Sequence, residues 1–154
     1  MAVQGIYTDL YRAKLAKLAA DNLGGAAADM LLVDFSVGEG GFDEIPPASG
    51  NRFPKTPTGS ETDLEADGIT EFKFTKAIGA ANISDNGSGV LTVVCILDAA
   101  EAGLDGEGLL DGADPRLFEL VLFDNDAEAM VYVTFDETIK TAGKRIDIEV
   151  TVTY

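Results

Sequence analysis

Histidine and cysteine, the side chains that most often act as nucleophiles, bases and metal ligands, are nearly missing from this chain. No histidine is present, which removes the Ser-His-Asp and Cys-His arrangements and the common zinc ligand sets. Cys95 is the single cysteine and lies in the apolar run VLTVVCILDAA, so we expect a buried, inert thiol and no internal disulfide. We therefore predict that the protein is not an enzyme and has no catalytic residue and no cofactor.

Carboxylates are the chemically capable groups that the chain has in excess, with 27 acidic residues against 11 basic ones. Two clusters offer the hard oxygen ligands that calcium prefers. They are Asp105, Glu107, Asp111 and Asp114 in residues 105–114, and Asp124, Asp126 and Glu128 in residues 124–128. The first cluster does not have EF-hand spacing, and acids are also common in turns because they bond their own backbone. We predict no metal site, and a calcium- or carbohydrate-binding β-module remains the alternative function.

The stretch FSVGEGGFDEIPPASG, residues 35–50, raises the question of phosphate binding, because helix N-termini behind glycine-rich loops hold phosphate. No P-loop motif occurs in the chain. The stretch also carries Glu39, Asp43 and Glu44 where a phosphate would need basic residues. We therefore expect no phosphate site. Its glycines permit positive φ and close backbone approach, so a docking loop and an internally packed surface loop both fit the stretch.

The formal net charge of −16 limits the partners of the protein. A field of this sign repels nucleic acid and anionic membranes. No run reaches the roughly 18 apolar residues of a membrane span, and the start MAVQGIYTDL lacks the basic and apolar regions of a signal peptide. We expect no nucleic-acid partner, no membrane insertion, and a protein that is made and kept in a cytoplasm or released from it by lysis.

The chain is expected to position its acidic and apolar candidate side chains on one helix and on a β-rich second half. YTDLYRAKLAKLAADNLGG has helical periodicity, with Thr8 or Asp9 to cap its start and glycines to end it. We predict an α+β fold in which this helix packs on a mainly antiparallel β-sheet or β-sandwich with long acidic loops. The expected parts of a single domain, 1–154, are a helix at about 7–23, an irregular loop at about 38–68 and a β-rich part at 69–154.

Apolar runs and alternation predict the individual strands. DMLLVDFSVG and VLTVVCIL are typical of buried strands, the second with both faces covered. LFELVLF and MVYVTF predict a hairpin around the polar link DNDAEA. RIDIEVTVTY alternates, with residues such as Ile148 on one face and Asp147 and Glu149 on the other. This last strand either forms an edge guarded by its acids or completes the sheet.

Four segments also share the form of known motifs, in the same order. YTDLYRAKLAKLAA has the form of an opening helix T-D-x-G-x-A-x-L-A-x-A, and VDFSVGEGG that of a strand and turn φ-A-V-G-D-G-G. LFELVLFDNDAEAMVYVTF has the form of the hairpin φ-x-E-φ-G-L-φ-D-x-D-G-x-L-φ-x-V-x-x-φ-P, and ETIKTAGKRIDIEVTVTY that of the piece after it. Together they span nearly the whole chain and resemble the phage tail-collar fibre proteins, also described as tail fibre or baseplate-associated proteins.

The resemblance implies a structural virion protein of a phage or phage-like tail, assembled in the host bacterial cytoplasm. Such a protein connects the baseplate or collar to fibres or to neighbouring tail subunits, and its partners are other tail, baseplate and fibre proteins. The resemblance further implies a homo-oligomer, a trimer being common among fibre components, and a glycine turn that launches a docking loop. The candidate interface residues are Phe42, Ile45, Phe53 and Tyr154.

Overall fold

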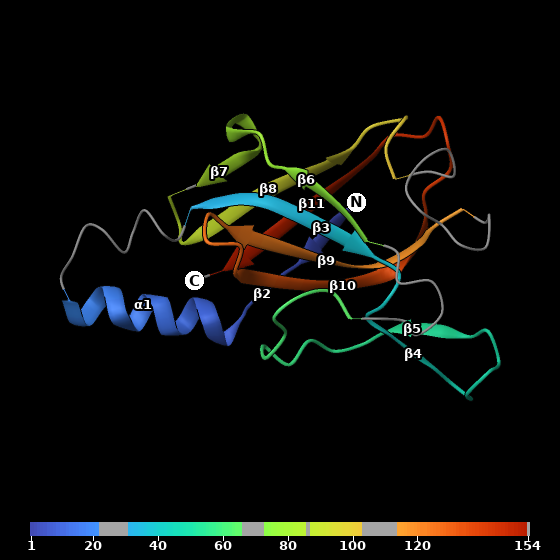
Figure 1. The fold of residues 1–154 in the computed structure, drawn as a ribbon, viewed down its shortest axis with the longest axis horizontal. Helices are drawn as coiled ribbons and strands as arrows, with labels where there is room; N and C mark the ends of the chain where they lie inside the picture. The colour runs from blue at the N-terminus through green and yellow to red at the C-terminus, as the bar shows by residue number, and fades with distance from the viewer. Residues whose placement is uncertain (22–30, 66–72, 86, 103–113, 154) are drawn as a thin grey trace.

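The computed structural model describes residues 1–21, 31–65, 73–85, 87–102 and 114–153, and Figure 1 shows how their elements are arranged. The first elements are β1 (Ala2–Gln4), β2 (Ile6–Tyr7), α1 (Asp9–Asp21), β3 (Leu32–Gly38), β4 (Phe42–Glu44) and β5 (Arg52–Pro54). They are followed by β6 (Lys73–Ala77), the 3-10 turn η1 (Ala80–Asn82), β7 (Ile83–Asp85), β8 (Val90–Leu97), β9 (Arg116–Asp124), β10 (Ala129–Ile139) and β11 (Ile146–Thr153).

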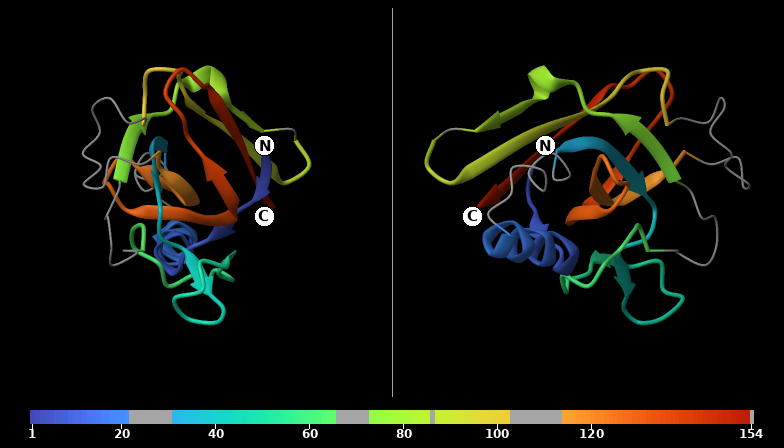
Figure 2. Two further views of the ribbon diagram at one scale, coloured as in Figure 1. Left: turned by 90° about the vertical axis from the view of Figure 1, so that its right-hand side faces the viewer. Right: turned by 60° about the vertical axis from the view of Figure 1, so that its left-hand side comes forward.

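The strands form two larger sheets and one small one. The strand orders are β1-β11-β8-β7, β2-β10-β9-β3-β6 and β4-β5. Neighbouring strands are antiparallel, apart from β1, which runs parallel to β11. The two larger sheets contribute inward side chains to one core, as the layers in Figure 2 indicate. The core draws on both sheets, with members such as Phe35, Leu97, Leu120, Val133 and Ile148.

The predicted α+β class is wrong, because the fold is mostly β. Strands hold most of the residues in regular secondary structure, and α1 is the one α-helix among the described residues. Figure 1 shows α1 running outward from β2, past the ends of the strands, rather than covering a sheet. The error has a physical cause. Helical periodicity and capping are local signals, whereas strands of two or three residues such as β1 and β2 are too short to show alternation.

The helix start agrees with its sequence signal. The hydroxyl of Thr8 accepts a hydrogen bond from the Tyr11 amide at 3.2 Å and donates one to the carbonyl of Ala129 at 2.5 Å. Thr8 therefore caps the helix and ties it to the first residue of β10. The helix begins at Asp9 and ends at Asp21, and residues 22 and 23 of the predicted span lie outside the described part of the chain.

The longer predicted strands are confirmed. DMLLVDFSVG contains β3, VLTVVCIL is β8, and the hairpin is formed by β9 and β10. β11 alternates between buried and exposed residues and lies between β1 and β8, so it completes the sheet and is not an edge. Only one face of β8 is fully buried, against the expectation of two. Cys95 is buried on that face, as predicted, and loss of solvation raises the pKa of its thiol to about 12.

The glycine-rich turn after β3 packs against its own chain. A Cβ on Gly40 would lie 1.8 Å from the carbonyl oxygen of Glu65, and one on Gly41, where φ is +72°, would lie 2.8 Å from the Cβ of Glu119. Both positions therefore require glycine, one for close approach and one also for its backbone angle. The acid Glu39 of the same turn accepts a hydrogen bond from the Arg116 amide at 2.7 Å. The turn is thus an internal packing feature lined with carboxylates.

Replacing Gly40 with alanine is expected to lower the free energy of unfolding by about 1–3 kcal/mol, the usual cost of overpacking. The Glu65 backbone must move to admit the methyl group. Gly79 is the control, because its added Cβ would meet nothing closer than an Asn82 side-chain atom at 3.3 Å. Urea denaturation of both variants tests the prediction. Equal stability of the two would show that the Glu65 carbonyl shifts freely.

Candidate docking site

The segment after the glycine turn is a projecting hairpin, not a fully irregular loop as predicted for residues 38–68. β4 and β5 form a two-stranded antiparallel ribbon that stands away from the larger sheets in Figures 1 and 2. We call residues 42–54 the arm. Three-residue strands among prolines and glycines give almost no alternation, which is why the sequence did not reveal them.

The outward face of the arm carries two large exposed apolar side chains. Asp43 is paired with Phe53, and the Ile45 amide donates to the Asn51 carbonyl at 3.0 Å, which continues the pairing by one step. Ile45 and Phe53 are therefore diagonal neighbours on one face. Their exposed fractions are 62% and 54%, and the two side chains lie together rather than singly.

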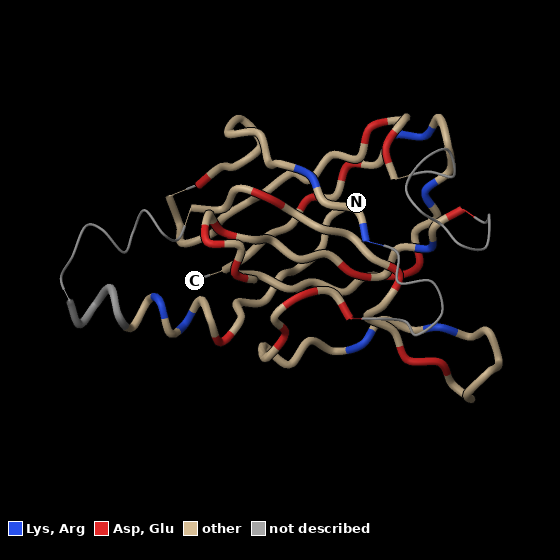
Figure 3. The backbone as a smooth tube through the Cα atoms, viewed as in Figure 1, with Lys and Arg blue, Asp and Glu red and all other residues tan. Residues whose placement is uncertain are grey.

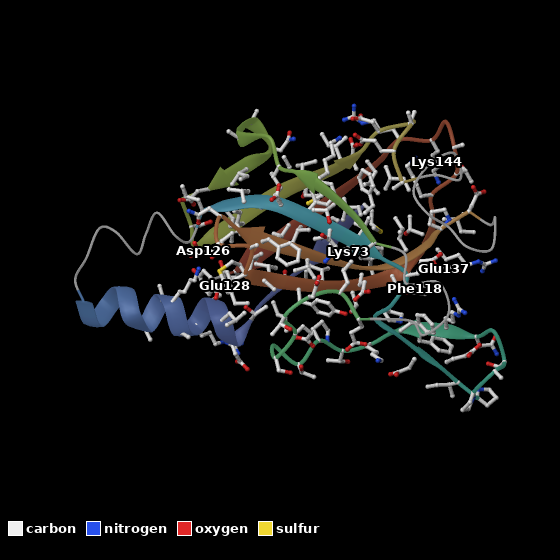
Figure 4. The ribbon with its side chains drawn as sticks, viewed as in Figure 1. Lys73, Phe118, Asp126, Glu128, Glu137 and Lys144 are labelled. Atoms are coloured by element: carbon white, nitrogen blue, oxygen red, sulfur yellow. The ribbon has the colours of Figure 1, made fainter. Side chains whose placement is uncertain are left out.

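The inward face anchors the arm to the sheets. The ring of Phe42 packs against that of Phe118 with 5.0 Å between centroids, and the Arg52 guanidinium lies 4.4 Å from the Phe42 centroid. Phe118 is fully buried in β9, and Figure 4 shows it at the root of the arm. The structure thus places the predicted interface residue Phe42 inside its own chain, where it holds the arm in position.

The tip of the arm is held by one carboxylate. Glu44 accepts hydrogen bonds from the amide of Ala48 at 3.2 Å and from that of Gly50 at 2.5 Å. The Ser49 amide also donates to the Pro46 carbonyl at 3.1 Å. These bonds fix the loop before any partner arrives, and pre-organisation of this kind reduces the entropy cost of binding.

The root of the arm is tied to the body by the residue after β5. The Lys55 amide donates to the Gly41 carbonyl at 2.9 Å, and the Lys55 carbonyl accepts from the Thr134 hydroxyl of β10 at 2.5 Å. The Lys55 ammonium pairs with Glu65 at 2.5 Å. The arm is therefore anchored to the body at its root by two hydrogen bonds of the Lys55 backbone and an ion pair.

The structure brings together two of the four predicted interface residues. Ile45 and Phe53 share the outward face of the arm, and Phe42 lies on its inward face. Tyr154 lies outside the described residues. The resemblance to tail proteins suggested these side chains as parts of a docking loop, but the sequence carried no information about which face each would take.

The acidic cluster at residues 124–128 is occupied by a lysine. Ligand oxygens of Asp124, Asp126 and Glu128 all lie within 4.8 Å of one another, and Figure 4 shows the last two beside α1. The Lys14 ammonium of α1 lies 2.5, 2.9 and 2.8 Å from the three carboxylates. Burial lowers the pKa of Lys14, but these hydrogen bonds outweigh it and hold the pKa well above its usual range. The Lys14 ammonium thus occupies the position where the alternative function requires calcium. Of the other acidic cluster, residues 105–114, positions 105–113 lie outside the described part of the chain.

A buried carboxyl group under the glycine turn was missed by the sequence analysis. Glu119 is fully buried in β9 and accepts hydrogen bonds from the Tyr132 hydroxyl at 2.6 Å and the Glu65 amide at 2.8 Å. Loss of solvation raises its pKa to about 7, against the opposing effect of these hydrogen bonds. The available signal was a single acid within the apolar run LFELVLF.

Comparisons with protein-family models, with curated proteins and with solved structures find no match to this chain. The resemblance to phage tail-collar fibre proteins therefore stays a prediction. Among the described residues, no helix combines the length and the apolar character needed to cross a membrane. Figure 3 shows acidic residues along most of the chain, whereas basic residues gather at a few places, α1 among them.

Proposed function

We propose that the protein is a non-enzymatic structural subunit of a phage or phage-like tail, which connects the baseplate or collar to fibres or neighbouring tail subunits. It works by docking through the arm. The observation that supports docking is the exposed pair Ile45 and Phe53 on one face of a hydrogen-bonded, projecting hairpin. The sequence resemblance, which covers four segments in order, supports the tail as the place of docking.

The arm has the energetic properties of a docking element. Full burial of a large apolar side chain stabilises a complex by about 1.5–3 kcal/mol, and more than half of each side chain is still exposed here. Burying Ile45 and Phe53 together is therefore worth about 2–3 kcal/mol. A few such anchors supply most of the affinity of an interface. The net charge of −16 keeps free subunits soluble before they assemble.

The alternative calcium- or carbohydrate-binding module gains no support from the described residues. The cluster at residues 124–128 already binds Lys14. The outward face of the arm presents Ile45 and Phe53 beside the acid Asp43, rather than a convergent set of polar groups. Docking therefore accounts for more of the observed geometry than ligand binding does.

Replacing Phe53 with aspartate is expected to leave the fold intact and to weaken docking about 30-fold, the effect of losing a hot spot worth about 2 kcal/mol. Ile139→Asp is the matched control, because Ile139 is also an exposed apolar residue but lies in β10, outside the arm. Each variant is expressed from its own locus, and its amount in purified tail particles is compared with wild type by immunoblotting.

Two results would contradict the proposal in different ways. Normal incorporation of the Phe53→Asp protein would show that the arm is not the docking element. Absence of the wild-type protein from every tail particle, or a gene neighbourhood without tail genes, would remove the assignment to a tail.

A further inference from the structure

A pocket lies between α1, the segment that contains β1 and β2, and the end of β11. Its volume is about 450 Å³, within the range of about 300–1,000 Å³ that is typical of binding pockets. Most of its lining is apolar, and Ile6, Tyr11, Leu15 and Val152 contribute to it. Arg12 also lines the pocket and is its basic residue.

The helix side of this pocket presents an ordered apolar surface. The rings of Tyr7 and Tyr11 are stacked with centroids 3.9 Å apart, which forms a flat aromatic wall. Leu15 follows Tyr11 by one helical turn and is 44% exposed. An exposed leucine beside stacked aromatic rings leaves apolar surface that a partner side chain can cover.

The pocket also has a positive charge at its edge, from Arg12. The Arg12 guanidinium is exposed and pairs with Asp9 through one nitrogen at 2.9 Å, and a guanidinium has five N–H donors in all. On the arm, Asp43 is the exposed acid directly opposite Phe53 in the pairing register. The arm therefore offers two apolar side chains beside an acid, and the pocket offers apolar walls beside a base.

The arm and the pocket lie at different ends of the molecule. Figure 1 shows α1 at one end and the β4–β5 ribbon at the other, and no residue of the arm lines the pocket. A contact between them therefore joins two molecules. It is a head-to-tail contact, because each molecule uses a different surface on each side.

We propose that the arm docks into the pocket of a second copy of this chain, so that Ile45 and Phe53 meet Tyr11 and Leu15. This inference rests on the arm being the docking element of the proposed function. Asp43 then faces Arg12 of the next copy, which sets the orientation of the contact. Each copy can therefore contact two neighbours, one through its arm and one through its pocket. A ring forms where the rotation between copies closes, and an open filament forms where it does not.

Sedimentation velocity of the purified full-length protein, from about 1 to 500 µM at about 0.15 M salt, tests the contact. We expect concentration-dependent oligomers, closed or filamentous. Phe53→Asp weakens the arm side and Leu15→Asp weakens the pocket side, so each variant alone is expected to stay monomeric at concentrations where the wild type assembles. Ile139→Asp is expected to assemble as wild type does.

Mixing the two monomeric variants gives a sharper test. The Phe53→Asp protein keeps an intact pocket and the Leu15→Asp protein keeps an intact arm. Together they are expected to form a 1:1 dimer that does not grow further. Asp43→Arg and Arg12→Asp are each expected to weaken assembly about 10-fold, and the double variant, with the charges exchanged, is expected to regain it.

A wild-type monomer at every concentration would overturn the inference, and so would oligomers that none of these variants disturb or a mixture that stays monomeric. Its failure is distinguishable from that of the proposed function. If the pure protein is monomeric but Phe53→Asp still fails to enter tail particles, the arm docks on a different tail protein. If the pure protein assembles through the arm but never enters a tail, the self-contact stands and the tail assignment falls.

Discussion

Replacing Lys14 with methionine is expected to lower the free energy of unfolding by about 3 kcal/mol. The Lys14 ammonium pairs with three carboxylates, and the side chain of one of them, Asp124, is 0% exposed. The variant leaves that carboxylate buried without its cation, and removing one partner of a buried pair typically costs about 3–5 kcal/mol. The lower end applies because the Lys14 side chain is 19% exposed and water reaches part of the cluster.

The Lys14→Met variant is also expected to weaken the turn between β9 and β10. Asp124 also accepts hydrogen bonds from the amides of Asp126 and Glu128, each at 3.0 Å, so its carboxylate organises the turn as well as binding Lys14. Because the pKa of Lys14 is raised by the fold, the stability from this cluster is fully present below the unfolded pKa, about 10.4. It is lost only as the pH rises through the higher folded value.

Chemical denaturation at neutral pH and about 1 µM protein, the lowest concentration of the sedimentation series, measures the effect. Arg145→Met is the control, because the Arg145–Asp147 pair is exposed, with side chains 55% and 48% accessible. Exposed pairs contribute about 0–1 kcal/mol. A Lys14→Met protein as stable as the Arg145→Met protein would mean that solvent satisfies the cluster without the lysine.

The parts of the fold that the sequence predicted are those in which one local pattern decides the structure. β11 shows alternation over its whole length, and β3, β8 and the β9–β10 hairpin are apolar runs bounded by turn residues. The parts it missed depend on pairing between distant residues. β1 becomes a strand because it lies beside β11, at the other end of the chain, and three residues carry no pattern that would indicate this.

The candidate docking site also has parts that the sequence could suggest and parts that depend on residues far away in the chain. Ile45 and Phe53 were proposed as interface residues because the resemblance implies a docking loop after the glycine turn. That Phe42 faces inward follows only from the β4–β5 register and from the position of Phe118, neither of which is local. The lysine that occupies the acidic cluster comes from α1, far away in the sequence, so the cluster looked available for calcium.

Raising the pH from 5 to 8.5 is expected to remove about 2–3 kcal/mol of stability through Glu119 alone. Loss of solvation raises the pKa of this carboxyl group from its ordinary value of 4.5 to about 7 in the folded protein. The folded state therefore binds a proton that the unfolded state has released between these two pH values. Stability from Glu119 is present at low pH, falls as the pH rises towards 7 and is constant above it. Each pKa unit corresponds to about 1.4 kcal/mol.

Other acids shift in the opposite direction, so the wild-type profile alone does not isolate Glu119. Hydrogen bonds hold the pKa of Glu61 below its usual value in spite of burial, and that contribution is lost as the pH falls. Glu119→Gln removes only the ionisation of interest and keeps an oxygen to accept from Tyr132. The difference in unfolding free energy between Glu119→Gln and wild type, followed by urea denaturation across this pH range, is therefore the quantity to measure.

The unfolding free energy of Glu119→Gln is expected to rise relative to that of wild type as the pH rises. A pH-independent cost of burying the glutamine amide would not change this trend. Tyr132→Phe sharpens the test, because the Tyr132 hydroxyl donates to Glu119 and lowers its pKa, so its removal is expected to move the midpoint above 7. A difference that does not vary with pH would show that Glu119 is hydrated in solution. Since the Glu65 amide and the glycine turn at the root of the arm both contact Glu119, that result would also mean that the root opens to water.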